Sequence, residues 1–206
     1  YADTNISLKK IVNIDPIAPG PPGSVSIIKV DYNHEPVKKL SISWQQSIEL
    51  DFFKYTIFHA RSENETKSIF ASFLDKNTTT IDTPDFTVLN DNWYWIEIED
   101  TTGQKTIGNP FFLPKDPPPI ASQLDSILFI DQSFHFSWDL STESDLSGYV
   151  IEQVSFLDTS TIYLSDIINK NITNFKRSIN IDSEHHYRLH TNDVWGNSTY
   201  SNILPT

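Results

Sequence analysis

The sequence predicts an all-β protein that consists of two tandem antiparallel β-sandwiches in an elongated arrangement. Three observations support this prediction: a long internal repeat, apolar residues that alternate along short segments, and prolines that gather in two stretches. A repeat whose period approaches the size of a domain indicates two copies of one domain, whereas periods of about 20–50 residues indicate solenoids.

The internal repeat is visible when the two halves of the chain are compared. Residues 40–58 read LSISWQQSIELDFFKYTIF, and residues 134–152 read FHFSWDLSTESDLSGYVIE. The matched positions are Trp44 and Trp138, Asp51 and Asp145, Tyr55 and Tyr149, Tyr94 and Tyr187, Asp100 and Asp193, and Gly103 and Gly196. The first three pairs are 94 residues apart, and the last three are 93 apart. We therefore predict one domain over residues 17–112 and a second over residues 113–206.

Within each copy, apolar and polar residues alternate along short segments. Leu40, Ile42 and Trp44 would share one face of a strand. Ser41 and Ser43 would then lie on the opposite face. A single apolar face is typical of a half-buried antiparallel strand. Several such strands within about 95 residues favour a sandwich of two sheets.

Nine of the twelve prolines lie in two stretches, DPIAPGPPG at residues 15–23 and NPFFLPKDPPP at residues 109–119. Such segments favour extended polyproline geometry and act as semi-rigid spacers of about 3 Å per residue. We therefore expect rod-like units held at defined separations. Residues 1–16 alternate like a strand. They form either the last strand of a preceding domain or an N-terminal arm that pairs with its own or another subunit's sheet.

Composition excludes several classes of partner. The net charge of −12 comes without a basic cluster, so neither nucleic acid nor an anionic membrane surface is an expected partner. The chain contains no Cys, so packing alone holds the domains together. No apolar run approaches the roughly 18 residues of a membrane span, so we expect no membrane insertion.

The repeated landmarks resemble a known family. The pattern W-x(6)-D-x(3)-Y, followed by Y-x-I/L-x(3)-D-x(2)-G, is similar to that of fibronectin type III domains, and SDLSGY at 144–149 and DVWGNS at 193–198 resemble its microbial members. The resemblance implies two seven-stranded β-sandwiches. With the alternation, it implies a core that contains Trp44, Tyr55, Tyr94, Trp138, Tyr149 and Tyr187. The family pattern would place a further aromatic at Asn92 and His185, so its tyrosine-corner hydrogen bond is absent or shifted here.

Exposed aromatics are the strongest candidates for a binding surface. Trp93 and Trp95 flank Tyr94, so if Tyr94 faces inward both tryptophans face outward on one sheet. Two exposed Trp rings would suit sugar stacking or protein docking, and Phe58 and Trp195 would extend the aromatic area. The competing interpretation is that a linker segment, such as Phe111–Phe112, covers these rings.

Metal binding has weaker support. His186 and His190 would share an outer strand face, but zinc takes three or four nitrogen or sulfur ligands, so we expect no metal there. Calcium takes six to eight oxygens and remains possible at acidic loops. The candidate oxygens belong to Glu49 and Asp51, to Glu143 and Asp145, and to Asn90, Asp91 and Asn92. We expect no other cofactor.

The sequence contains no nucleophile elbow, phosphate-binding loop or metalloprotease motif, so we expect no enzymatic activity. The leading interpretation is a non-catalytic structural, adhesion or assembly module of an extracellular or cell-surface protein. Its partners would be neighbouring domains of the same protein or other surface proteins. One alternative is an accessory carbohydrate-binding or spacer module of a secreted polysaccharide-degrading enzyme, with glycans as ligands. A second alternative is a filament or phage-tail subunit.

Overall fold

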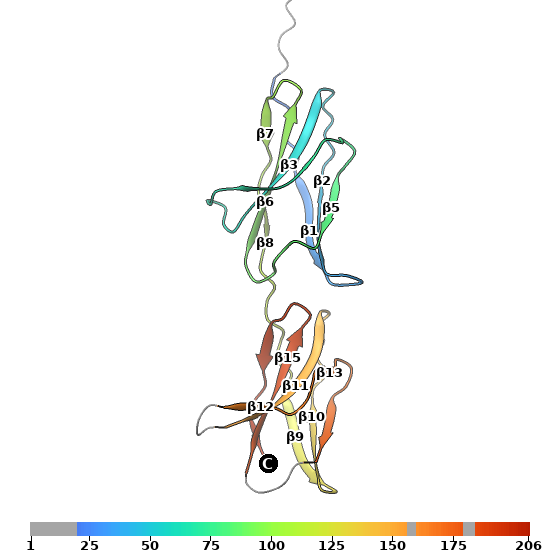
Figure 1. Cartoon of the computed structure of the whole chain (residues 1–206), viewed down its shortest axis with the longest axis vertical. Helices are drawn as coiled ribbons and strands as arrows, with labels where there is room; N and C mark the ends of the chain where they lie inside the picture. Colours follow the sequence, from blue (N-terminus) through green and yellow to red (C-terminus); the bar gives the residue numbers. More distant parts are fainter. Residues whose placement is uncertain (1–19, 156–159, 179–183) are drawn as a thin grey trace, which may run out of the picture.

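The computed structural model describes residues 20–155, 160–178 and 184–206, so the strand or arm predicted for residues 1–16 lies outside the described residues. Two β-sandwiches are stacked end to end along the long axis of the molecule (Figure 1). Every helix or strand assigned in these ranges is a β-strand. Within the same ranges there is consequently no helix long and apolar enough to span a membrane. The predicted all-β fold with antiparallel sandwiches is confirmed.

The first sandwich contains eight strands in two sheets. They are β1 (Ile27–Asn33), β2 (Lys39–Trp44), β3 (Phe52–Ala60), β4 (Ser68–Phe73), β5 (Thr80–Thr83), β6 (Asn92–Asp100), β7 (Lys105–Ile107) and β8 (Phe111–Leu113). One sheet has the order β1-β2-β5, and the other has the order β4-β3-β6-β7 with β8 also paired to β6. Because β7 and β8 pair with the same strand, they form one interrupted edge.

The second sandwich repeats this arrangement. Its strands are β9 (Leu124–Ile130), β10 (Ser133–Trp138), β11 (Leu146–Val154), β12 (Thr161–Tyr163), β13 (Ile168–Asn169), β14 (Asn174–Arg177), β15 (His186–Asp193), β16 (Ser198–Tyr200) and β17 (Leu204–Pro205). The sheets have the orders β14-β10-β9 and β12-β11-β15-β16, with β13 paired to β11 and β17 paired to β15. The two copies therefore share a topology as well as a sequence pattern.

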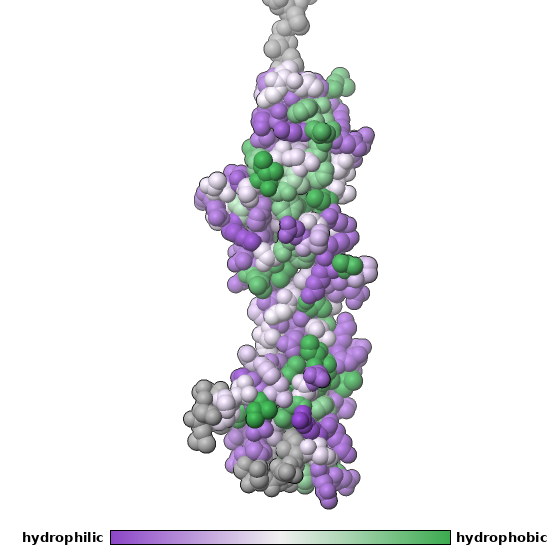
Figure 2. All heavy atoms as spheres, viewed as in Figure 1, coloured by the Kyte–Doolittle hydropathy of each residue, from purple (hydrophilic) through white to green (hydrophobic). Residues whose placement is uncertain are grey.

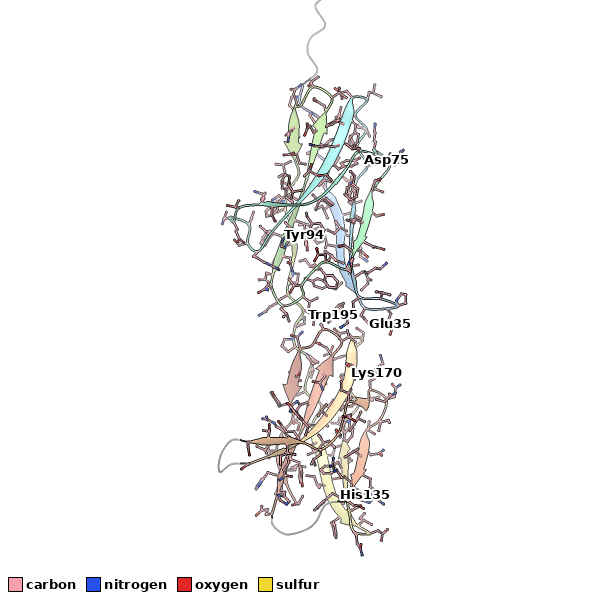
Figure 3. All side chains as sticks on the ribbon, viewed as in Figure 1. Glu35, Asp75, Tyr94, His135, Lys170 and Trp195 are labelled. Atoms are coloured by element: carbon pink, nitrogen blue, oxygen red, sulfur yellow. The ribbon has the colours of Figure 1, made fainter. Side chains whose placement is uncertain are left out.

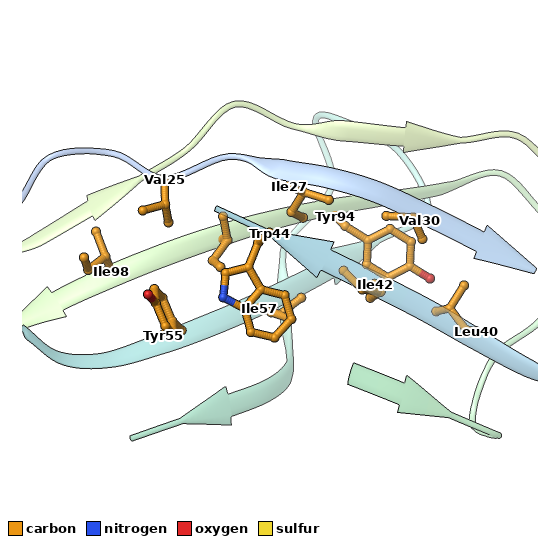
Figure 4. Close-up of a cluster of buried hydrophobic side chains, with 11 residues drawn as sticks. Val25, Ile27, Val30, Leu40, Ile42, Trp44, Tyr55, Ile57, Tyr94 and Ile98 are labelled. Atoms are coloured by element: carbon orange, nitrogen blue, oxygen red, sulfur yellow. The ribbon is translucent and has the colours of Figure 1, made fainter. Parts of the chain in front are cut away.

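Each sandwich has its own hydrophobic core between its sheets. In the first, the Trp44 ring lies 5.9 Å from Tyr55, measured between ring centroids (Figure 4). It lies 5.3 Å from Phe73 by the same measure. In the second, the Trp138 ring lies 5.5 Å from Tyr149. The six aromatics expected in the core are all buried: Trp44, Tyr55, Tyr94, Trp138, Tyr149 and Tyr187. Alternation along the strands is the reason, since it puts these rings on the inward faces.

Two details differ from the sequence expectations. Leu113, placed at the start of the second domain, packs against the core of the first. Asn92, where the resemblance to fibronectin type III domains would place an aromatic, is fully buried. Its Nδ2 donates hydrogen bonds to the Tyr32 Oη at 2.8 Å and to the backbone oxygens of Thr87 at 3.1 Å and Asn90 at 2.7 Å. An amide can hold this loop because its two N–H donors are shared among these three oxygens, whereas a tyrosine supplies one donor.

Candidate functional site: the joint between the two sandwiches

A tight turn between β15 and β16 forms the end of the second sandwich that faces the first. The Oδ1 of Asp193 accepts hydrogen bonds from the backbone nitrogens of Trp195, Gly196 and Asn197, at 2.7 to 2.8 Å. Gly196 has a φ of +99°, in the left-handed region that a residue with a Cβ rarely adopts. The turn is therefore fixed by the Asp and Gly of the DVWG motif, and it carries the Trp195 side chain.

The Trp195 ring packs against the end of the first sandwich (Figure 3). Its contacts come from the end of β1, from the β1–β2 connection and from the β5–β6 connection. Ring centroids lie 5.9 Å away for Tyr32, 5.9 Å for Phe86 and 6.1 Å for His34, and the Lys38 Nζ lies 5.6 Å from the indole. The Lys38 ammonium also donates to the backbone oxygen of Val194. Trp195 thus joins the two sandwiches through aromatic, cation–π and hydrogen-bond contacts.

The linker is fastened to both sandwiches at Asp116. Its backbone nitrogen donates to the Val88 oxygen of the first sandwich at 2.9 Å. Its carboxylate accepts a hydrogen bond from the Asn197 Nδ2 of the second sandwich at 3.0 Å. The same Asn197 nitrogen donates to Asp193 Oδ2 at 2.9 Å. Because one residue is tied to both sides, rotation about the linker would break these bonds.

Three carboxylates meet at this point. One oxygen each from Asp116, Asp145 and Asp193 lies within 4.8 Å of the others. Burial raises the pKa of the Asp116 carboxyl to about 6, and the charges of Asp145 and Asp193 act in the same direction. Asp116 therefore takes up a proton at a higher pH than an ordinary aspartate, and the cluster concentrates negative charge in the joint.

Three other carboxylates expected to bind calcium have structural partners. Glu49 Oε1 accepts from the backbone nitrogen of Gly23 at 2.8 Å, and Glu143 Oε1 accepts from that of Ile120 at 3.2 Å. Asp91 Oδ1 accepts from the backbone nitrogen of Lys115 at 2.9 Å. These side chains hold the segments that enter and leave each sandwich. Of the carboxyls expected to bind calcium, only Asp145 joins the cluster at the joint.

The predicted aromatic surface is divided by the fold. Trp93 and Trp95 do lie on the same outer sheet face, with ring centroids 6.5 Å apart. However, Trp95 is only 4% exposed, and the Lys67 Nζ lies 4.6 Å from the centre of its ring. Phe112 lies 4.8 Å from Trp93 between ring centroids, as the competing interpretation expected. The expectation that both tryptophans are exposed is therefore wrong for Trp95.

The two remaining aromatics of that expectation have different surroundings. Phe58 is half-buried and lies directly across from Trp95 in the β3–β6 pairing. Trp195 belongs to the second sandwich and lies at the joint, so it does not extend the surface formed by the rings of the first sandwich. The sequence did contain a signal for the joint: the third position of the turn motif is Trp195 in the second copy and Thr102 in the first.

His190 lies on the outer face of β15, as the alternation of side chains along the strand predicted, but it is buried in an ion cluster. Its Nε2 lies 2.8 Å from Glu152 Oε2, and Arg188 also donates to this oxygen. The rings of Tyr163 and Tyr200 flank the imidazole at 5.6 and 4.4 Å. Burial alone would raise the pKa of Glu152, but the hydrogen bonds from Arg188 and His190 outweigh burial and lower it. The Glu152 carboxylate is thus hydrogen-bonded by both Arg188 and His190, and the rings of two tyrosines pack against the imidazole.

Comparison with known proteins gives a solved structure but no family. The sequence matches no protein-family model and no curated protein. Among solved structures, the chain is similar to one described as the chicken CNTN1 FN1–FN3 domains, a run of fibronectin type III domains. The similarity has 13% identity and a TM-score of 0.39, and it covers 91% of this chain and 67% of that chain. At this identity and TM-score the likeness adds nothing to what the strands themselves show, which is a pair of antiparallel β-sandwiches.

Proposed function

We propose that the chain is a non-catalytic structural module of an extracellular or cell-surface protein, in which two sandwiches act as a spacer of fixed geometry. The observation that supports this function is the joint, where Trp195 of one sandwich packs against both Tyr32 and Phe86 of the other. Its partners would be neighbouring domains of the same protein or other surface proteins.

A fixed joint needs contacts that outweigh the entropy lost when two domains are held together. Tandem domains move relative to one another by default unless their interface is substantial. Here a large aromatic side chain, a cation–π contact and hydrogen bonds from both sandwiches act within one short linker. These contacts favour a spacer that transmits orientation as well as distance.

Carbohydrate binding by an accessory module is the alternative. Because Trp95 is covered, the rings available on that face are Trp93 and Phe112, whose planes are tilted by 38°. A sugar platform usually needs coplanar or stepped rings open to solvent, so we rank this function below that of a spacer.

Distance measurements between the two sandwiches test the proposal. The chain has no Cys, so Glu63→Cys and Lys176→Cys provide one spin-label site in each sandwich without competing thiols. We expect a single narrow distance distribution for the parent and a broad one after Trp195→Ala. Trp93→Ala is the matched control, because it removes the same side chain away from the joint and should leave the distribution narrow. A broad distribution in the parent, or no broadening after Trp195→Ala, would contradict a fixed joint.

A further inference from the structure

A cavity of about 280 Å³ lies in the first sandwich, where β3 ends and the β5–β6 connection enters β6. The rings of Phe70, Phe86 and Tyr94 line it, and Arg61 brings a positive charge to it. Figure 2 shows apolar groups interspersed with polar ones along the rod, without one dominant apolar patch. The cavity is therefore a more specific candidate for a binding site than the outer surface is.

The aromatic walls of the cavity are held by contacts with one another. The rings of Phe70 and Tyr94 meet edge to face with centroids 5.7 Å apart, and the His59 ring lies 5.1 Å from that of Tyr94. The volume is just below the roughly 300 Å³ at which pockets for drug-sized ligands begin, so it suits a molecule with a single ring. A flat ring can pack against such walls in offset or edge-to-face geometry.

The Arg61 guanidinium is positioned at the cavity by Asn92. Arg61 Nη1 donates to Asn92 Oδ1 at 2.7 Å, and His59 Nε2 lies 2.9 Å from the same oxygen. Arg61 forms no ion pair with any acidic side chain in the part of the chain that the structure describes. A guanidinium has five N–H donors in a planar fork that matches a carboxylate. The donors that Asn92 does not use can therefore bind an anion.

The Tyr94 hydroxyl supplies a second polar group. The residue is only 2% exposed, yet no described residue makes a hydrogen bond with this hydroxyl. By contrast, Tyr55 Oη accepts a hydrogen bond from the backbone nitrogen of Ser47 at 2.6 Å. Tyr149 Oη does the same for Ser141 at 2.8 Å. Burial raises the pKa of the Tyr94 hydroxyl, so it stays protonated and can donate to a bound molecule.

The internal repeat shows that the fold does not require Arg61. In the second sandwich, at the positions equivalent to the imidazole and amide beside Arg61, Gln153 Nε2 lies 3.1 Å from His185 Nδ1. Both copies therefore pair an imidazole with an amide at this place. The position of Arg61, however, is occupied by Ser155 in the second copy. The guanidinium is thus an addition to the first copy, and a role in binding accounts for it.

We propose that this cavity binds a small aromatic carboxylate, which pairs with Arg61 through its carboxylate and packs its ring against Phe70 and Tyr94. Asp85 also lines the cavity, and its negative charge would weaken the binding of an anion. With one charged contact and one ring, we expect a dissociation constant on the order of 1 mM. The site lies within the first sandwich, so the proposal does not depend on the spacer function.

A nuclear magnetic resonance titration of the whole ¹⁵N-labelled chain with benzoate, at constant ionic strength, tests the proposal. We expect saturable shifts of the backbone amide signals of Arg61, Asn92 and Tyr94. Benzamide has the same shape without the charge, and benzylamine carries the opposite charge. Each should bind at least about tenfold more weakly than benzoate, because neither can pair with a guanidinium.

Four variants assign the contacts. Arg61→Ser introduces the side chain of the second copy and should weaken benzoate binding at least about tenfold. Tyr94→Phe removes only the hydroxyl and should weaken it about threefold. Asp85→Asn removes a repulsive charge and should tighten it. Arg177→Ser is the matched control, because it removes an exposed arginine from β14 of the other sandwich and should leave binding unchanged.

Several results would overturn the proposal. They are the absence of saturable shifts up to about 20 mM benzoate, roughly twenty times the expected dissociation constant, and equal binding of benzoate and benzamide. Unchanged binding by Arg61→Ser, or shifts confined to residues away from the cavity, would also contradict it. Melting temperatures would verify that the variants are folded. The comparison of benzoate with benzamide uses the parent alone, so it tests the proposal even where a substitution destabilises the first sandwich.

Discussion

The two sandwiches bury equivalent Trp and Tyr residues in their cores, but the outer faces of their larger sheets differ in chemistry. In the first, Phe58 lies across from Trp95 in the pairing of β3 with β6. In the second, the equivalent cross-strand position pairs Glu152 with Arg188. One copy therefore has an aromatic pair where the other has an ion pair, although both pairs occupy the same place on the same fold.

The difference shows which positions the fold constrains. Inward positions must fill a closed volume, and both copies use Trp and Tyr there. A side chain on an outward face needs only a neighbour that covers its apolar surface or partners that make its hydrogen bonds. In the first copy Lys67 covers Trp95, and in the second Arg188 and His190 satisfy Glu152. Two physical solutions, a cation over a ring and a hydrogen-bonded carboxylate, are thus interchangeable on this face.

The largest effect is expected in the shared core. Trp44→Ala should lower the free energy of unfolding of the first sandwich by about 3–5 kcal/mol, because it leaves a cavity among buried rings. Since the two cores are separate clusters, the second sandwich should change by less than about 1 kcal/mol. Peptide-resolved amide hydrogen exchange in urea would measure both, and Trp138→Ala should reverse the pattern. Equal loss in both sandwiches would show that they unfold as one unit.

The ion cluster of the second outer face should give the next largest effect. Glu152→Gln should cost about 2 kcal/mol at pH 7, less than a fully buried pair would, because Arg188 reaches solvent. The pKa of Glu152 is lowered by folding, so its contribution is present above pH 4.5 and is lost as the pH falls below that value. Thermal melts between pH 3 and 7 should therefore show a smaller acid destabilisation for the variant than for the parent. Identical acid profiles would contradict this assignment.

At the joint, the carboxyl of Asp116 should behave in the opposite way. Its pKa is about 6 when folded, against an ordinary value of 3.8, so the folded chain holds more protons between these values. Raising the pH through this window therefore lowers the free energy of unfolding. Asp116→Asn should remove that dependence and stabilise the chain at pH 7 by on the order of 1 kcal/mol, a value reduced for partial solvent exposure. The isosteric amide keeps the hydrogen bond with Asn197, and a variant less stable than the parent at pH 7 would count against repulsion in the cluster.

The smallest effect is expected on the aromatic face of the first sandwich. Trp93→Ala should change stability by less than about 1 kcal/mol, since the ring is half-exposed and loses mainly its contact with Phe112. We expect no binding of soluble polysaccharides to either the parent or this variant in calorimetry or affinity electrophoresis. Binding by the parent that is lost in the variant would instead support the carbohydrate-binding alternative.

Much of the fold could be predicted from sequence because its signals are local. Alternation over five residues is enough to place Trp44 inward, and DVWG alone is enough to place a turn at Gly196. Trp195 stands out in the sequence because the first copy has Thr102 at this position, but its partners could not be predicted, since it contacts Tyr32, which is more than 160 positions earlier in the chain. Burial of Trp95 was also missed, since it depends on Lys67 from another strand connection. Alternation along a strand tells which face of the sheet a side chain lies on, but the residues that cover this face depend on tertiary contacts.

The attachment of Asp116 to both sandwiches has a mechanical consequence. Tension applied along the rod passes through the linker, and there it meets a few hydrogen bonds and one ring before it reaches any strand ladder. Those few contacts should yield first and release a short length of slack while both cores stay folded. Under load, the joint would open before either core unfolds, and it would re-form when the Trp195 side chain returns to its place.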